Sequence, residues 1–218
     1  MAIGGKKMKK NSQLQNVAIQ HFREYSSLYM FIIVLFLMGV ICGSIIVNSL
    51  SYTQKEDLLY YLSRFFGQVA DGQISSSTEM FIESVKHNIQ YIGLIWIFGI
   101  SIIGLPLILV LLFLKGVVIG FTVGFLVSTM GWEGFQIALM AVLPQNIILV
   151  PLTIFITVLS VALSINIISR LFFKQVRYPL KPVLIRYIVS FIICVLFITG
   201  AGAIEAYFSP LFMQQIVS

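Results

Sequence analysis

Charged residues are absent from long parts of this sequence and make up only 10% of its 218 residues, against about 25% in soluble domains. Five windows contain no Asp, Glu, Lys or Arg: Tyr25–Gln54, Asn88–Leu114, Gly116–Trp132, Gly134–Ser169 and Tyr187–Ile204. A helix needs about 20 mostly apolar residues to cross a bilayer, and a charge at the bilayer centre costs about 2.5–3.5 kcal/mol. The windows exclude a soluble globular protein. They predict an all-α, polytopic integral membrane protein with about five transmembrane helices.

Cysteine and catalytic motifs are also scarce. Cys42 and Cys194 each lie in a charge-free window, where a thiol behaves as a small hydrophobic group. His21 and His87 stand alone, and there is no zinc-binding HExxH run, no GxSxG elbow and no phosphate-binding glycine loop. We therefore expect no catalytic residue, no cofactor and no metal, and we interpret the chain as a non-enzyme. The net charge of +6 does not indicate nucleic-acid binding, because the basic residues flank the apolar windows.

The domain organisation is simple. Residues 1–27 are expected to form a cytoplasmic N-terminal segment, and residues 28–218 a single membrane domain with an extracytoplasmic loop at 51–87. The apolar stretch Leu28–Leu50 exceeds the roughly 7–15 residues of a signal-peptide core, which favours a retained first helix.

The distribution of Lys and Arg predicts the orientation. If the N-terminus is cytoplasmic and the windows cross alternately, all but Lys55, Arg64 and Lys86 of the 14 basic residues lie inside. Basic residues concentrate in cytoplasmic segments of membrane proteins, so we expect the N-terminus inside and the C-terminus outside. Lys115 is expected at a cytoplasmic turn between the second and third spans.

Prolines predict irregularities in the spans. Window Gly134–Ser169 is too long for one ordinary crossing, and its Pro144 removes a backbone donor and disfavours helix at the preceding residue. We expect a re-entrant or interfacial helix near Gly134–Val142, then a span from Asn146 to Ser169. Pro106 and Pro151 should kink the second and fourth spans. A discontinuous helix at Pro144 would also suit a permease-like or channel subunit.

The loop at 51–87 is expected to contain two short helices joined by a turn near Asp71–Ser77. Apolar residues recur at helical spacing and form the candidate docking face: Leu58, Leu62, Phe65, Phe66, Val69, Met80 and Phe81. This face either rests on the bilayer or the protein's own spans, or binds an extracytoplasmic partner. The two interpretations are compatible.

Glycines repeat at four-residue spacing in two windows. Gly39 and Gly43 lie in the first, and Gly116, Gly120 and Gly124 in the third. Small residues at this spacing let helix backbones approach closely. The pattern favours packing within one subunit, with a homodimer seam as the alternative.

Several strings resemble the stage II sporulation protein M family of endospore-forming bacteria. They are VLFLMGVICGSIIVNSL, QKEDLLYYLSRFFGQVADG, HNIQYIGLIWIFGISIIGLPLI, LFLKGVVIGFTVGFLVSTMGWEGF, VLPQNIILVP and IEAYFSP. The likeness is close over Tyr29–Pro151 and resumes near Glu205–Pro210.

The resemblance implies a membrane scaffold for sporulation engulfment, located at the septum and the engulfing mother-cell membrane. It implies two partners, sporulation proteins P and D, which are membrane-anchored peptidoglycan-degrading enzymes. The chain's role would be to localise and position these enzymes during peptidoglycan remodelling. The resemblance supplies no catalytic residue.

Overall fold

The computed structural model describes residues 25–70, 77–173 and 180–217, and the regular structure within these ranges is helical. The elements are α2 (Ser26–Ser49), α3 (Tyr52–Ala70), α4 (Ser77–Ile100), α5 (Gly104–Ile137), the π-helical segment η1 (Ala138–Val142), α6 (Leu143–Phe173) and α7 (Leu180–Val217). Four stretches are long and apolar enough to cross a membrane: Ser26–Ser49, Gly104–Met140, Leu143–Leu171 and Pro182–Ala203. The predicted all-α polytopic class is confirmed. Since α4 is not among these four, a count of five spans stays a prediction.

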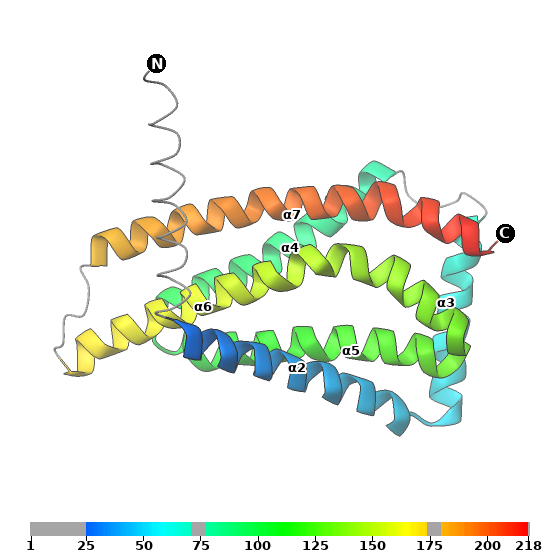
Figure 1. Ribbon diagram of the computed structural model, residues 1–218, viewed down its shortest axis with the longest axis horizontal. Helices are drawn as coiled ribbons and strands as arrows, with labels where there is room; N and C mark the ends of the chain where they lie inside the picture. The colour runs from blue at the N-terminus through cyan, green and yellow to red at the C-terminus, as the bar shows by residue number, and fades with distance from the viewer. Residues whose placement is uncertain (1–24, 71–76, 174–179, 218) are drawn as a thin grey trace, which may run out of the picture.

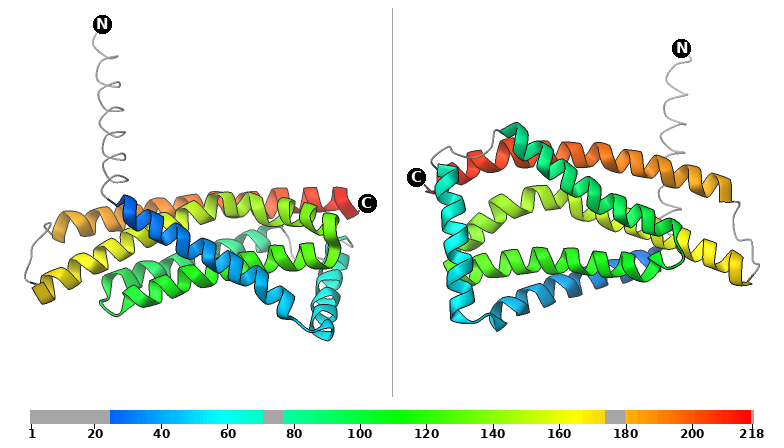
Figure 2. Two further views of the ribbon diagram at one scale, coloured as in Figure 1. Left: turned by 60° about the horizontal axis from the view of Figure 1, so that its bottom comes forward. Right: turned by 180° about the vertical axis from the view of Figure 1, so that it is seen from behind.

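Five long helices run side by side with alternating direction (Figure 1). The central one is α6, which contacts α2, α4, α5 and α7. Helix α3 lies across one end of the bundle, beside the α5–α6 turn, in every view of Figures 1 and 2. The bundle therefore has one end covered by a transverse helix, and the chain's last helix finishes at that same end (Figure 1).

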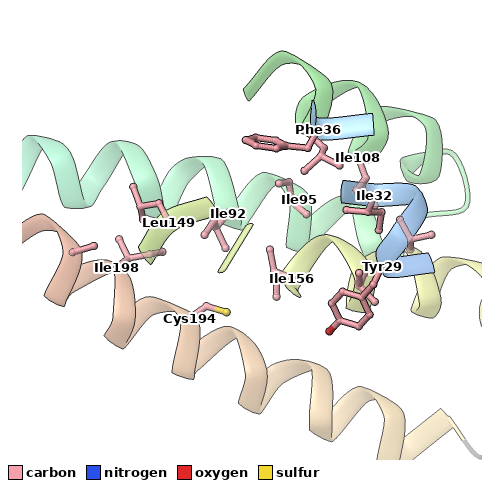
Figure 3. Packing of buried hydrophobic residues seen from close by; sticks show 14 residues of the cluster. Tyr29, Ile32, Phe36, Ile92, Ile95, Ile108, Leu149, Ile156, Cys194 and Ile198 are labelled. Carbon is pink, nitrogen blue, oxygen red and sulfur yellow. The ribbon is translucent and has the colours of Figure 1, made fainter. Parts of the chain in front are cut away.

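All five long helices contribute to one apolar core (Figure 3). Its fully buried side chains include Ile32 of α2, Ile95 of α4, Leu112 of α5, Ile156 of α6 and Ile198 of α7. The opposite faces of α2, α5 and α7 expose large apolar side chains, as expected of helices that meet lipid. Between helices in lipid, van der Waals packing and hydrogen bonds replace the hydrophobic effect as the main attraction.

The predicted packing glycines lie in one contact between α2 and α5. A Cβ at Gly39, Gly43, Gly116 or Gly120 would overlap a backbone carbonyl oxygen of the facing helix. A Cβ at Gly124 would lie 3.2 Å from the Cα of Ser44. We call this contact the glycine seam. Both of its faces are occupied within one chain, so it cannot serve the homodimer that the same spacing also suggested.

A side-chain hydrogen bond crosses the glycine seam. The Ser44 hydroxyl lies 3.0 Å from the carbonyl oxygen of Val40 in its own helix and 3.3 Å from that of Gly120 in α5. The seam therefore combines close backbone approach with a polar tie, the two interactions that hold membrane helices together.

The predicted boundary between the second and third spans is wrong. The chain turns at residues 101–103, so Lys115 lies within α5 and not at a turn. Pro106 does not kink a continuous span, because it falls in the first turn of α5, where the missing N–H has no intrahelical partner. Lys115 is the charge nearest to this turn, but the turn itself contains no charged residue.

The chain reverses direction within α5, near its C-terminal end, and this reversal depends on two glycines. Gly131 has φ 59° and ψ −127°, a left-handed conformation that side chains other than glycine rarely adopt. A Cβ at Gly134 would overlap the Leu126 carbonyl. The helix axis therefore reverses at Gly131 with almost no loop.

Residues 132–173 are helical throughout, so the predicted helix break at Pro144 and Asn146 is not observed. The π-helical turn of η1 comes directly before Pro144, and its wider hydrogen-bond ladder accommodates a residue without an N–H. The Asn146 side-chain amide donates to the Val142 carbonyl at 2.7 Å. The discontinuity that suggested a permease-like site is therefore missing from this part of the chain.

Pro151 lies inside α6 and removes one backbone donor from its hydrogen-bond ladder. Such a proline is an established cause of bending, and α6 is visibly bent in Figure 1. The bend lets α6 remain central while contacting helices on several sides.

The predicted loop at 51–87 is shorter in the structure. Helix α4 begins at Ser77 and continues without interruption to Ile100, so residues 77–87 are part of a long helix and not a separate short one. There is no glycine or proline between Ser77 and Gly93 to end it. Residues 71–76 of the predicted turn, and residues 1–24 of the N-terminal segment, lie outside the described residues.

We expect Gly120→Ala to destabilise the protein. The added methyl group meets the Val40 backbone, which cannot move aside without shifting α2, and overpacking typically costs about 1–3 kcal/mol. The matched control is Gly200→Ala on α7, where no atom lies within 4 Å of the new Cβ. Thermal unfolding in mild detergent measures the difference, and equal melting temperatures for the two variants would contradict the glycine seam.

Candidate functional site

The candidate site is α3, which follows α2 after Leu50 and Ser51. Leu50 is extended, with ψ 136°, so the chain changes direction there. The Ser51 N–H donates to the Gln54 side-chain oxygen at 3.0 Å, and the Gln54 N–H donates to the Ser51 hydroxyl at 3.4 Å. This reciprocal pair is a capping box, which satisfies two donors that the first turn would otherwise leave open. The capping box starts α3 only two residues after the end of α2.

One face of α3 packs on the bundle. Leu58 and Leu62 are half-buried, and Leu62 lies against a second apolar cluster built from Leu126, Ile137 and Ala138. For Leu62, the predicted apolar face therefore covers the protein's own helices. Phe81 of α4 is half-buried and lies near Gly202 of α7. Nothing is described of four other candidate docking side chains: Phe65, Phe66, Val69 and Met80.

The part of α3 that does not pack on the bundle carries exposed tyrosines, which are not among the predicted docking residues. Tyr52, Tyr60 and Tyr61 are 78%, 63% and 68% exposed. The rings of Tyr60 and Tyr61 meet edge to face with centroids 6.0 Å apart. Charged side chains alternate with them, and Glu56, Asp57 and Arg64 are all exposed. These tyrosines are visible in the sequence, but the apolar residues at helical spacing in α3 mark only its most hydrophobic face.

The same end of the bundle presents a further exposed aromatic residue. Trp132 directly follows the Gly131 turn and is 72% exposed. Its ring stacks on Phe135 with centroids 5.3 Å apart. The end of the bundle that α3 covers therefore has an exposed surface of aromatic and charged side chains. Leu62 packs α3 against the bundle at this end.

Polar groups inside the bundle are used to join helices. Tyr187 of α7 donates its hydroxyl proton to the Trp96 carbonyl at 2.8 Å and lies 2.7 Å from the Ser160 hydroxyl of α6. Ser164 donates to the Gly99 carbonyl of α4 at 2.9 Å. These bonds join α4, α6 and α7 around one level of the core.

A second polar contact between helices lies nearer the N-terminal end of α4. The Gln145 amide donates to the Ser84 hydroxyl at 3.3 Å, and Asn88 donates to the Ser84 carbonyl at 3.0 Å. Hydroxyls and amides of this kind satisfy one another within the membrane and need no titratable group. Among the described residues, no group of three or more His, Cys, Asp or Glu could hold a metal ion.

Lys115, which was predicted to lie at a turn, is a charged side chain within the bundle. It is half-buried in α5, and its Nζ lies 5.2 Å from the centroid of the Tyr91 ring of α4. The Tyr91 hydroxyl donates to the Leu111 carbonyl at 2.7 Å. A cation over an aromatic face is attracted by the ring quadrupole, which stabilises the ammonium group away from water.

A protein-family model described as stage II sporulation protein M matches residues 32–210. Neither the curated proteins nor the solved structures contain a match to the chain. The matched region begins in α2 and ends in α7, so it includes the whole of α3, α4, α5 and α6.

The two faces of α3 should respond differently to substitution. Leu62→Ala removes packing on Leu126 and Ile137, and we expect a loss of about 1–2 kcal/mol for a half-buried leucine. The neighbouring Tyr61→Ala removes a solvent-exposed ring and should leave the melting temperature nearly unchanged. A Tyr61→Ala variant as unstable as Leu62→Ala would show that both faces are structural.

Proposed function

The chain belongs to the stage II sporulation protein M family, and from that membership we propose that it is a non-enzymatic membrane scaffold for sporulation engulfment. In this role it localises peptidoglycan-degrading enzymes at the septum and the engulfing mother-cell membrane. It positions them against the wall while their own active sites carry out the chemistry.

The observation that carries the proposal is the division of α3 into two faces. Leu62 holds the helix on the bundle, whereas Tyr52, Tyr60 and Tyr61 project from it without cover. Tyrosine and arginine are enriched among the residues that dominate binding energy at protein interfaces. A helix that packs on the bundle through Leu62, with exposed tyrosines beside Arg64, is suited to bind a partner.

The proposed partners are sporulation proteins P and D, the wall-degrading enzymes of the same process. They act on the outer side of the membrane, so the α3 end of the bundle must face outward and the N-terminal segment inward. The sequence supports this orientation, because α6 ends and α7 begins at the opposite end (Figure 1), and the sequence around this connection contains five basic residues: Arg170, Lys174, Arg177, Lys181 and Arg186.

The non-enzymatic part of the proposal rests on how the polar groups are used. The hydroxyls and amides of Ser160, Tyr187 and Gln145 bond to other helices, so they are committed to the fold. The ionisable side chains of α3, such as Glu56 and Asp57, are exposed. No cofactor is required by the proposed role.

We expect the double substitution Tyr60→Ser with Tyr61→Ser to lower recovery of sporulation proteins P and D in a pull-down from sporulating cells. The protein itself should accumulate normally, since both rings are exposed. The control Tyr60→Phe with Tyr61→Phe keeps the rings and should retain most of the binding. Undiminished recovery from the serine variant would reject α3 as the docking surface and direct attention to Trp132 and Phe135.

The orientation can be tested by cysteine labelling of intact protoplasts. With Cys42 and Cys194 replaced by alanine, a membrane-impermeant thiol reagent should modify Tyr61→Cys but not Arg177→Cys. Permeabilised cells should label at both positions, which controls for reactivity. Equal labelling of the two sites before permeabilisation would contradict the proposed topology.

A further inference from the structure

Helix α4 carries a face that no other described helix covers. The residues of this face follow one another at alternating three- and four-residue spacing: Glu83, Lys86, Gln90, Gly93, Ile97 and Ile100. Glu83, Lys86 and Gln90 are exposed, and so are Ile97 and Ile100. Helix α4 lies on the near side of the bundle in the right view of Figure 2. Such spacing is the pattern of side chains that pack one helix against another.

The charged part of this face belongs to the stretch of α4 that contacts α6 and α7, at the level of the middle of α5. The bond from Tyr91 to the Leu111 carbonyl places these two residues level with each other, and Leu111 is about 10 Å along α5 at 1.5 Å per residue. Residues 83–90 of α4 run back from that level toward the α3 end. At the corresponding depth α5 exposes Leu114 and Val118, which are side chains that suit lipid.

Charges facing lipid at this depth are unfavourable. In the described part of the chain, no hydrogen bond or ion pair involves the side chains of Glu83, Lys86 or Gln90, and none of these residues has a further interaction of this kind. The polar groups of the α4 face are therefore available to a polar partner from outside the described chain.

Gly93 belongs to the exposed face of α4 and differs from the glycines that make close contacts inside the bundle. A Cβ at Gly93 would have no atom within 4 Å, whereas one at Gly99 in the same helix would meet Ser160 and Tyr187. Gly93 is thus not needed for any contact among the described residues. Glycine within a helix costs stability relative to alanine, and close approach of a second helix would use the space that it leaves.

We infer that the α4 face binds a second copy of this chain, in a dimer whose two-fold axis runs along the membrane normal. The face is self-complementary, because it carries an acid and a base three residues apart. In a symmetric pair, Glu83 meets Lys86 of the second copy and Lys86 meets Glu83 of the second copy. The Gln90 amides then face each other, Gly93 allows close approach, and Ile97 and Ile100 fill the deeper part. An isologous interface has this symmetry, and side-chain amides commonly bond across membrane helices.

Disulfide cross-linking of the full-length chain in lipid vesicles, without other sporulation proteins, tests the inference. In a background with Cys42 and Cys194 replaced by alanine, Gly93→Cys and Gln90→Cys should each give a product of twice the chain mass on mild oxidation. The control Leu196→Cys is exposed on α7 and should give severalfold less. Equal cross-linking at Leu196 and Gly93, or no dimer at Gly93, would overturn the inference.

Charge reversal tests whether the partner on the α4 face is a second copy of this chain. In the Gly93→Cys background, Glu83→Lys or Lys86→Glu alone should lower the cross-linked fraction severalfold, because like charges then meet. The two reversals together restore opposite charges and should recover cross-linking. Failure of the double reversal, or a product with a different protein in native membranes in place of the dimer, would also overturn it. The cross-linking assay in lipid vesicles contains no wall-degrading enzyme, so its outcome is independent of the scaffold proposal.

Discussion

The backbone contact between α2 and α5 is the interaction on which the rest of the bundle depends. Four glycines allow carbonyl oxygens of one helix to occupy the space where the other would carry a Cβ. Dispersion contacts of this kind are individually small and large in sum, and lipid offers no competing hydrophobic effect. With α5 fixed, the reversal at Gly131 returns the chain antiparallel. Helix α6 then lies at the centre, where Leu149 and Ile156 are buried.

Composition predicted the fold class because the cost of burying charge in lipid is large and nearly independent of context. The same argument failed at Lys115, since a long side chain can stay in the bundle over the ring of Tyr91. The true turn at residues 101–103 carries no charge and could be recognised only from its neighbouring glycines. The helix break predicted at Pro144 is not observed, for a different reason. A proline breaks an α-helical ladder, but the preceding π-helical turn of η1 accommodates it.

The predicted docking face on α3 stays a prediction, but the structure shows that Leu62, one of its residues, packs on the protein's own helices. Helical spacing selected Leu58 and Leu62 because they are the most hydrophobic residues of α3, and hydrophobicity alone does not say what a face contacts. Leu62 turned out to be held by Leu126 and Ile137. The exposed tyrosines are amphipathic, so a hydrophobic pattern gives them little weight. Only the packing of α3 on the α5–α6 turn shows which side remains available.

The short connection between α2 and α3 has a mechanical consequence. Only Leu50 and Ser51 separate the two helices, and Leu62 rests on the end of α5. A pull on α3 would therefore enter the bundle mainly through the covalent connection to α2, and it would load the contact between α2 and α5 in shear. In shear all the seam contacts resist together, whereas peeling would break them one at a time. The contact between α2 and α5 therefore resists a force along α2 better than a force that separates the two helices sideways.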